Sequence, residues 1–283
     1  MKESLVNSAI FYFSQVVTGN TKHIAEKIAE GLQKGGRCDL IRLAKYQNDL
    51  EMIKSFSFNK YDLIGIGVPV YYFHPPYHIL FELEHFPSLD GKKGFLFCTS
   101  GGNPGSTLFQ MKRVLDKTGL KIIDGYDKWI GWDVHQLYAR QENSNGNYGW
   151  LPSSYGHPNE QELNQAKEFG KALISKTLDQ STSEKLDFWS QENESAKKWS
   201  WKGIQKWFPE FNIINEKCTQ CGLCSQICPW DAIILNPYPQ WVKDCDRCYI
   251  CHLKCPENAI QCDFSKQIEY LERLMKNTKK MKH

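Results

Sequence analysis

The sequence predicts an α/β domain with a five-stranded parallel sheet, followed by a second, smaller domain. Two observations lead to this expectation. Short apolar segments alternate with segments of helical periodicity over about the first 176 residues. Eight of the eleven cysteines then lie close together after residue 217. The length of 283 residues also fits two domains at roughly 150 residues each.

The first domain alternates between short β-rich segments and helical segments. We expect strands at 8–13, 39–43, 63–68, 94–99 and about 122–134. We expect helices at 21–32, 48–56, 75–86, 106–118 and 159–176. This alternation predicts a doubly wound parallel sheet with helices on both faces. Such sheets bind ligands at the carboxyl ends of their strands.

Composition narrows the class of protein. Hydrophobic residues make up 41% and charged residues 24%, which excludes wholesale disorder. The apolar runs are shorter than the ~18 residues of a membrane crossing, so no span is expected. The first 13 residues lack the features of a signal peptide, which predicts a cytoplasmic, reducing location. There, a dense set of cysteines indicates metal or redox chemistry before disulfides.

The first strand-to-helix turn, residues 14–21, reads SQVVTGNT. Thr18, Gly19, Asn20 and Thr21 combine hydroxyl groups, a glycine and the start of a helix. Backbone amides and the positive end of a helix suit a phosphate dianion. The loop has no lysine, unlike a P-loop, so hydroxyls and amides would carry the binding. The alternative is a polar turn that only caps the helix.

Two further loops fall at strand ends. Residues 67–76 carry Tyr71 and Tyr72 after the third strand, and residues 98–105 form a glycine-rich loop after the fourth. An aromatic ring can stack on a planar cofactor, and a glycine-rich loop lets backbone amides approach its polar edge. The alternative for the two tyrosines is packing against the neighbouring loop.

In order and spacing, these three loops resemble those of flavodoxins over about residues 5–176. The resemblance implies a flavodoxin-like fold that binds FMN, with at least one of the two tyrosines beside the flavin. Flavodoxins usually place Thr or Ser two residues before T-G-x-T, where this chain has Val16. Alignment on Ser14 instead makes the loop two residues longer. The implied FMN contacts are Ser14, Thr18, Gly19, Asn20, Thr21, Pro69, Val70, Tyr71, Tyr72, Thr99, Ser100, Gly101, Gly102 and Asn103.

Eight cysteines form two runs of spacing C-x2-C-x2-C-x3-C, each followed by proline, with the second run 27 positions after the first. The duplication extends past the cysteines to Pro229, Ala232 and Ile233, which recur as Pro256, Ala259 and Ile260. Three thiolates at this spacing can wrap one face of a four-iron cubane, and the fourth iron needs a ligand from elsewhere. Structural zinc and a disulfide framework are the alternatives, and tetrahedral zinc gives no reason for a duplicated run that ends in Cys-Pro.

Residues 211–263 resemble a bacterial ferredoxin with two [4Fe-4S] clusters, a small α+β domain. In that arrangement the fourth cysteine of each run binds the other cluster. The resemblance implies one cluster on Cys218, Cys221, Cys224 and Cys255, and the other on Cys245, Cys248, Cys251 and Cys228. The remaining Cys38, Cys98 and Cys262 fit no ligand spacing, and we expect small buried or half-buried residues.

We therefore expect a flavodoxin-like domain at 1–177, a linker at 178–210, a ferredoxin domain at 211–263 and a basic tail at 264–283. The linker contains Trp189, Trp199, Trp201 and Trp207, which predicts that it packs and braces the two domains. The tail has a net charge of +4, and we expect it to form a solvated helix or a docking site for an acidic partner. Residues 135–158 are long for a connection between a strand and a helix, and we expect them to form either a wall over the flavin or a disordered insert.

The whole arrangement resembles flavodoxin–ferredoxin fusion proteins of anaerobic bacteria and archaea. The resemblance implies electron transfer between FMN, two clusters and external redox protein partners. One alternative is an FMN-dependent reductase of a small organic substrate that the clusters feed, and another is that the clusters only staple the fold. The net charge of +3 is too small to indicate nucleic acid. Each cluster would add about −2, which favours basic partners at the ferredoxin region.

Overall fold

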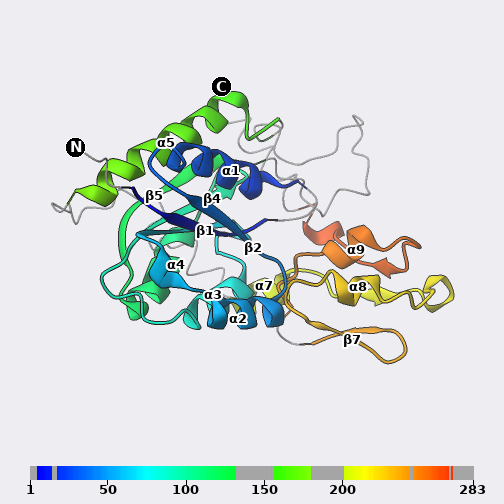
Figure 1. Cartoon of the computed structure of the whole chain (residues 1–283). Coiled ribbons are helices and arrows are strands. Elements are labelled where there is room, and N and C mark those ends of the chain that lie inside the picture. Colours follow the sequence, from blue (N-terminus) through cyan, green and yellow to red (C-terminus); the bar gives the residue numbers. More distant parts are fainter. Residues whose placement is uncertain are drawn as a thin grey trace, which may run out of the picture.

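The sheet of the first domain has the predicted class. The computed structural model describes residues 5–14, 18–131, 154, 156–179, 201–242, 245–267 and 269. The strands are β1 (Ser8–Phe13), β2 (Cys38–Leu43), β3 (Leu63–Pro69), β4 (Lys93–Ser100) and β5 (Lys121–Ile130). Their order is β2-β1-β3-β4-β5, and each neighbouring pair is parallel. This confirms the five-stranded, flavodoxin-like sheet that the sequence predicts (Figure 1).

Helices cover both faces of this sheet, because buried side chains alternate along its strands. Phe11 and Phe13 of β1 belong to one core, and Ile10 and Tyr12 belong to the other. The first core lies under α2 (Tyr46–Ser55), α3 (Tyr77–Glu84) and α4 (Thr107–Leu115). The second lies under α1 (Asn20–Leu32) and α5 (Glu160–Leu178), the two helices that lie together in Figure 1. Short 3-10 turns follow α2 and α4, at η1 (Phe58–Lys60) and η2 (Asp116–Thr118).

The helix starts differ slightly from expectation, for local reasons. α2 begins at Tyr46, two residues early, because the Asp49 carboxylate accepts hydrogen bonds from the amides of Ala44 and Lys45 at 2.7 Å each. α3 begins late, at residue 77, because two prolines precede it and proline disfavours helical geometry in the residue before it. β5 ends at residue 130, and the predicted positions 132–134 lie outside the described residues.

The C-terminal unit is small and α+β. Its elements are α7 (Trp201–Trp207), β6 (Asn212–Ile213), η4 (Asn215–Lys217), α8 (Leu223–Gln226), β7 (Ile233–Leu235), β8 (Pro239–Trp241), α9 (Ile250–Lys254) and β9 (Ile260–Gln261). β6 pairs with β9 and β7 pairs with β8, both antiparallel. Phe208, Tyr249 and Phe264 form a core against which Trp207 of the predicted linker packs.

Several expectations fall on parts of the chain that lie outside the described residues. They concern Trp189, Trp199, most of the 135–158 loop and the tail beyond residue 269. Within the part that is described, no helix combines the length and the apolar character of a membrane crossing.

Candidate functional site

The turn after β1 joins a left-handed glycine to the amino end of α1. Gly19 has a φ of 69° and occupies the N-cap position. The first turn of a helix leaves backbone amides without partners inside the helix and forms its positive end. The hydroxyl of Ser14, buried at the end of β1, accepts a hydrogen bond from the Lys22 amide at 3.2 Å. The predicted phosphate contacts from Thr18 to Thr21 therefore lie at a turn that suits an anion.

A buried hydrogen bond ties this turn to the end of β4. The hydroxyl oxygens of Thr21 and Thr99 are 2.8 Å apart, and both side chains are buried. The carbonyl of Thr99 also accepts a hydrogen bond from the Val70 amide at 2.9 Å. All three predicted FMN loops therefore meet at the carboxyl edge of the sheet. The hydroxyl of Thr21 already has a partner within this scaffold.

Polar side chains of the glycine-rich loop after β4 form hydrogen bonds with the backbone of the same loop. Ser100 accepts a hydrogen bond from the Gly102 amide at 3.2 Å, and Asn103 accepts one from the Gly105 amide at 2.9 Å. Gly102 has a φ of 121°, and none of the described residues places a heavy atom within 4 Å of a Cβ built there. The backbone around Gly101 and Gly102 can therefore approach a planar ring closely, which fits the predicted flavin.

The two tyrosines of the loop after β3 have different surroundings. Tyr71 is half-buried against the first core, with its ring centre 6.4 Å from that of Phe13. Tyr72 has a φ of 52° and faces the C-terminal unit. Its ring centre lies 4.0 Å from that of Phe208, and its hydroxyl donates a hydrogen bond to the Arg247 carbonyl at 3.2 Å. The stacking partner of the flavin stays a prediction.

The two cysteine runs fold as a repeated backbone. Left-handed residues recur 27 positions apart, as Gln220 and Arg247, Gly222 and Tyr249, and Asp231 and Asn258. The last cysteine of each run also accepts the same hydrogen bond, from the Ala232 amide to Cys228 and from the Ala259 amide to Cys255, both at 3.3 Å. Left-handed residues turn neighbouring amides toward one side, which creates a concavity that suits anionic sulfides.

One predicted ligand set lies together in the interior. Cys228, from the first run, packs with Cys245 and Cys251 of the second. Burial raises the pKa of the Cys248 thiol well above its usual range, and the other three thiols raise it further. Iron binding would therefore have to replace the proton on these thiols. The neighbourhood holds four thiols that could surround a four-iron cluster.

The other predicted set is more open. Burial raises the pKa of Cys224, and nearby Cys221 and Cys218 also raise it. Among the described residues, no three His, Cys, Asp or Glu side chains converge on a single metal ion. The thiolates of a four-iron cluster surround a larger body. Cys38 and Cys98 are buried apart from both runs, as expected.

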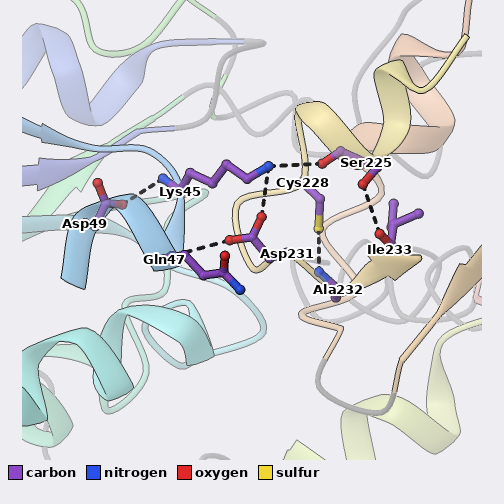
Figure 2. A network of polar contacts seen from close by, with 8 residues as sticks. All are labelled: Lys45, Gln47, Asp49, Ser225, Cys228, Asp231, Ala232 and Ile233. Carbon is purple, nitrogen blue, oxygen red and sulfur yellow. Dashed lines mark hydrogen bonds and ion pairs between the residues drawn. The ribbon is translucent and has the colours of Figure 1, made fainter. Parts of the chain in front are cut away.

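A polar contact links the loop after β2 to the end of the first cysteine run. The Lys45 ammonium nitrogen lies 2.8 Å from a carboxylate oxygen of Asp231, and the Gln47 amide donates a hydrogen bond to the other oxygen at 3.3 Å (Figure 2). The Tyr46 amide donates a hydrogen bond to the Pro229 carbonyl at 2.8 Å. This segment follows Cys228 directly, so the contact holds the chain beside a predicted ligand.

A second contact joins α3 to the second cysteine run. The His78 ring pairs with the Asp246 carboxylate, and both side chains are 1% exposed. The Trp230 ring packs beside them, with its centre 4.5 Å from that of Tyr46 and 5.4 Å from that of Phe81. The flavodoxin-like sheet and the cysteine-rich unit therefore share a packed, partly ionic interface.

Sequence reasoning missed the residues of this interface. Lys45 and Asp231, like His78 and Asp246, stand far apart in the chain and match no local motif. Glu82, one turn along α3 from His78, is also fully buried. Burial, followed by the nearby Asp49 and Asp246, raises the pKa of Glu82 to about 9. Only the apolar neighbours of His78 and Glu82 on α3 signal that this helix is buried.

Comparisons with known proteins match both parts of the chain. A flavodoxin domain matches residues 9–125, and a 4Fe-4S binding domain matches residues 211–234. An uncharacterized protein of Methanocaldococcus jannaschii is 26% identical over 168 residues, which cover 59% of this chain and 97% of that protein. A flavodoxin from the domain Archaea is 15% identical with a TM-score of 0.39, covering 61% of this chain and 99% of its own. The FMN-bound flavodoxin of Fusobacterium nucleatum is 14% identical with a TM-score of 0.40, covering 61% and 98%.

The two domain matches and the five-stranded sheet define an electron-transfer protein of the flavin and iron–sulfur type. The chain joins a flavodoxin domain to a 4Fe-4S ferredoxin-type motif, and it is a flavodoxin–ferredoxin fusion. A flavodoxin domain implies FMN, and the ferredoxin-type motif implies a 4Fe-4S cluster.

Proposed function

We propose that this protein carries electrons between one FMN, two [4Fe-4S] clusters and external redox proteins. FMN would occupy the loops at the ends of β1, β3 and β4, and each cluster would take one of the two cysteine sets given above. The proposed boundaries are 1–177 for the flavodoxin-like domain, 178–210 for the linker, 211–263 for the two-cluster ferredoxin domain and 264–283 for the tail.

The observation that carries this proposal is the contact between the loop after β3 and the second cysteine run. The Tyr72 hydroxyl lies 3.2 Å from the carbonyl oxygen of Arg247, between Cys245 and Cys248. Residues that flank the proposed flavin site therefore touch residues that flank a proposed cluster site. Clusters that only stapled the C-terminal unit would give no reason for this contact.

When bound, FMN exchanges one or two electrons and each cluster exchanges one, so the chain can convert between paired and single electrons. The protein's own residues supply binding and exclusion of water. The amino end of α1 favours the phosphate, and the backbone at Gly102 leaves room for the ring. The burial of Cys228, Cys245 and Cys251 would keep solvent from the cluster that they hold.

Cofactor content tests the proposal. Protein purified without oxygen should show flavin absorption and about eight iron atoms per chain. Thr18→Ala should weaken FMN binding while iron content stays unchanged. Thr118→Ala is the matched control, because that buried hydroxyl bonds the Leu115 carbonyl at 2.7 Å outside the proposed sites. Iron near zero together with bound zinc would contradict the proposal. Unchanged FMN affinity in Thr18→Ala would show that Thr18 does not contact FMN.

A cavity favours a second candidate function, an FMN-dependent reductase fed by the clusters. It has a volume of about 140 Å³ and is lined by Tyr71, Tyr72, His74, Tyr77 and Asp246, among others. A benzene-sized molecule fits a cavity of about 150 Å³. Dithionite-reduced protein mixed with NAD(P), quinones or nitro compounds separates the candidates, because fast, saturable turnover of one compound favours the reductase. Slow, unsaturated transfer to all of them favours the carrier.

A further inference from the structure

The two cysteine runs share a backbone but differ in burial. In the first run Cys221 is exposed, and Cys218 and Cys224 are half-buried. In the second run Cys245 and Cys251 are buried and Cys248 is half-buried. The fourth cysteines reverse the pattern, because Cys228 is buried and Cys255 is half-buried. The sequence repeat gives no reason for this asymmetry, because the ligand spacing is identical in both runs.

One position inside the repeat differs sharply in size between the two runs. Gly222 follows the second cysteine of the first run, and Tyr249 takes the corresponding place in the second. The Tyr249 ring is 1% exposed and packs against Phe264 at 4.9 Å and Phe211 at 5.1 Å between ring centres. Its hydroxyl donates a hydrogen bond to the Pro209 carbonyl at 2.8 Å. A large buried side chain thus stands in the second run at the position where the first run has a glycine.

Both runs meet the flavodoxin domain, mostly beside ligands of one crossed set. Tyr72 bonds the carbonyl of Arg247, and His78 pairs with Asp246, so both partners lie between Cys245 and Cys248. The segment after Cys228 makes further contacts, through Pro229 and Asp231 (Figure 2). Lys45 also donates a hydrogen bond to the Ser225 carbonyl at 3.5 Å, beside Cys224 of the other set. By the crossed ligand pattern, Cys228 belongs to the cluster of the second run. Most of these contacts therefore flank ligands of a single proposed cluster, and the Ser225 contact is the exception.

We propose a fixed order of electron transfer, which rests on the proposed function. The cluster of Cys228, Cys245, Cys248 and Cys251 is the inner cluster, next to the FMN loops. The cluster of Cys218, Cys221, Cys224 and Cys255 is the outer cluster, where external partners exchange electrons. Each step moves one electron from a reduced centre to an oxidised one, and no bond forms or breaks.

The surface beside Cys221 indicates the chemistry of the external partner. Leu235 is 43% exposed and Ile234 is 55% exposed. The Leu235 side chain lies 3.6 Å from a Cβ position at Gly222, so it borders the exposed cysteine. The neighbouring Glu216 and Lys217 cancel in charge, which leaves the outer cluster with about −2. This surface fits a one-electron redox protein with a basic face and an apolar centre.

Electron paramagnetic resonance of the fully loaded, partially reduced protein tests the order. Cys221→Ser and Cys248→Ser occupy matching positions in the two runs, and each should alter the signal of one cluster. A neutral, soluble dysprosium chelate speeds the spin relaxation of the centres that it approaches most closely. We expect faster relaxation of the signal that Cys221→Ser alters. Equal relaxation of both signals, or the reverse order, would overturn the proposal.

A surface substitution tests the same proposal without a change of ligand. Electron transfer from the reduced protein to mammalian cytochrome c, a basic haem protein, should slow about threefold or more in Leu235→Lys at low ionic strength. Leu178→Lys is the control, since Leu178 is 47% exposed at the end of α5. Equal rates in the two variants would overturn the assignment of the outer cluster as the place where external partners exchange electrons. Absence of flavin or four-iron clusters would overturn the proposed function itself, whereas a reversed order in the loaded protein overturns only this inference.

Discussion

Replacement of Glu82 by glutamine tests the electrostatics of the interior beneath the domain interface. Glu82 is 0% exposed, and among the described residues neither of its carboxylate oxygens has a hydrogen-bond partner. Burial, followed by the nearby Asp49 and Asp246, raises its pKa from 4.5 to about 9. The folded protein therefore holds a proton on Glu82 at neutral pH. Glutamine has nearly the same shape and is always neutral.

The raised pKa fixes the sign and size of the effect. The unfolded chain loses this proton above its ordinary pKa of 4.5, whereas the folded chain keeps it up to about 9. Between these values each pH unit lowers the free energy of unfolding by about 1.36 kcal/mol. From pH 6 to pH 8 the wild type should lose about 2.7 kcal/mol relative to Glu82→Gln. The contribution of the Glu82 proton to the free energy of unfolding is fully present below pH 4.5, and it is lost as the pH rises through about 9.

Urea unfolding of the anaerobic, cofactor-loaded protein at the two pH values measures this difference. Glu84→Gln serves as a control, because the Glu84 side chain is 45% exposed. The difference in free energy of unfolding between this variant and the wild type should be equal at the two pH values. Difference infrared spectra of wild type and Glu82→Gln should also contain the carbonyl stretch of a protonated carboxylic acid. A stability difference that does not change with pH, or the bands of an ionised carboxylate, would refute the reasoning.

Three further substitutions probe packing, capping and the interface. Gly67→Ala should lower the free energy of unfolding by about 1–3 kcal/mol, measured by urea unfolding. Its Cβ would lie 1.9 Å from the Phe97 ring, so an unchanged midpoint would contradict this packing. Asn159→Ala should lower the stability of α5 by about 1 kcal/mol in the same assay, because it removes a capping box. Tyr72→Phe loses the hydrogen bond to Arg247 and should weaken the domain contact by about 1 kcal/mol, seen as faster amide exchange in the second cysteine run. Unchanged exchange there would show that the hydroxyl contributes nothing.

Much of the fold could be predicted because its signals are local. β1 matches its expected bounds at both ends, since its six residues are all buried. The parallel direction of the strands follows from their alternation with helices. The beginnings of α2 and α3 shifted because Asp49 and two prolines act on single turns, which periodicity does not register.

The cysteine repeat could be recognised from spacing, whereas its asymmetry could not. Tyr249 adopts a left-handed conformation that favours glycine, as its counterpart Gly222 does. In the sequence alone this tyrosine is one aromatic residue between two cysteines. Its burial depends on Phe208 and Phe264, which come from opposite ends of the C-terminal unit. Only the folded chain brings these residues together.

The interface and the proposed inner cluster share the same short segments, which couples their formation. Asp231 stands three residues after Cys228, and Asp246 follows Cys245 directly. Each carboxylate reaches its partner on the flavodoxin domain only if the adjoining cysteine loop holds its shape. A cluster that fixes the two cysteines would therefore also fix the two carboxylates. Domain docking and assembly of the inner cluster should then stabilise each other, because binding to the folded state alone shifts the folding equilibrium.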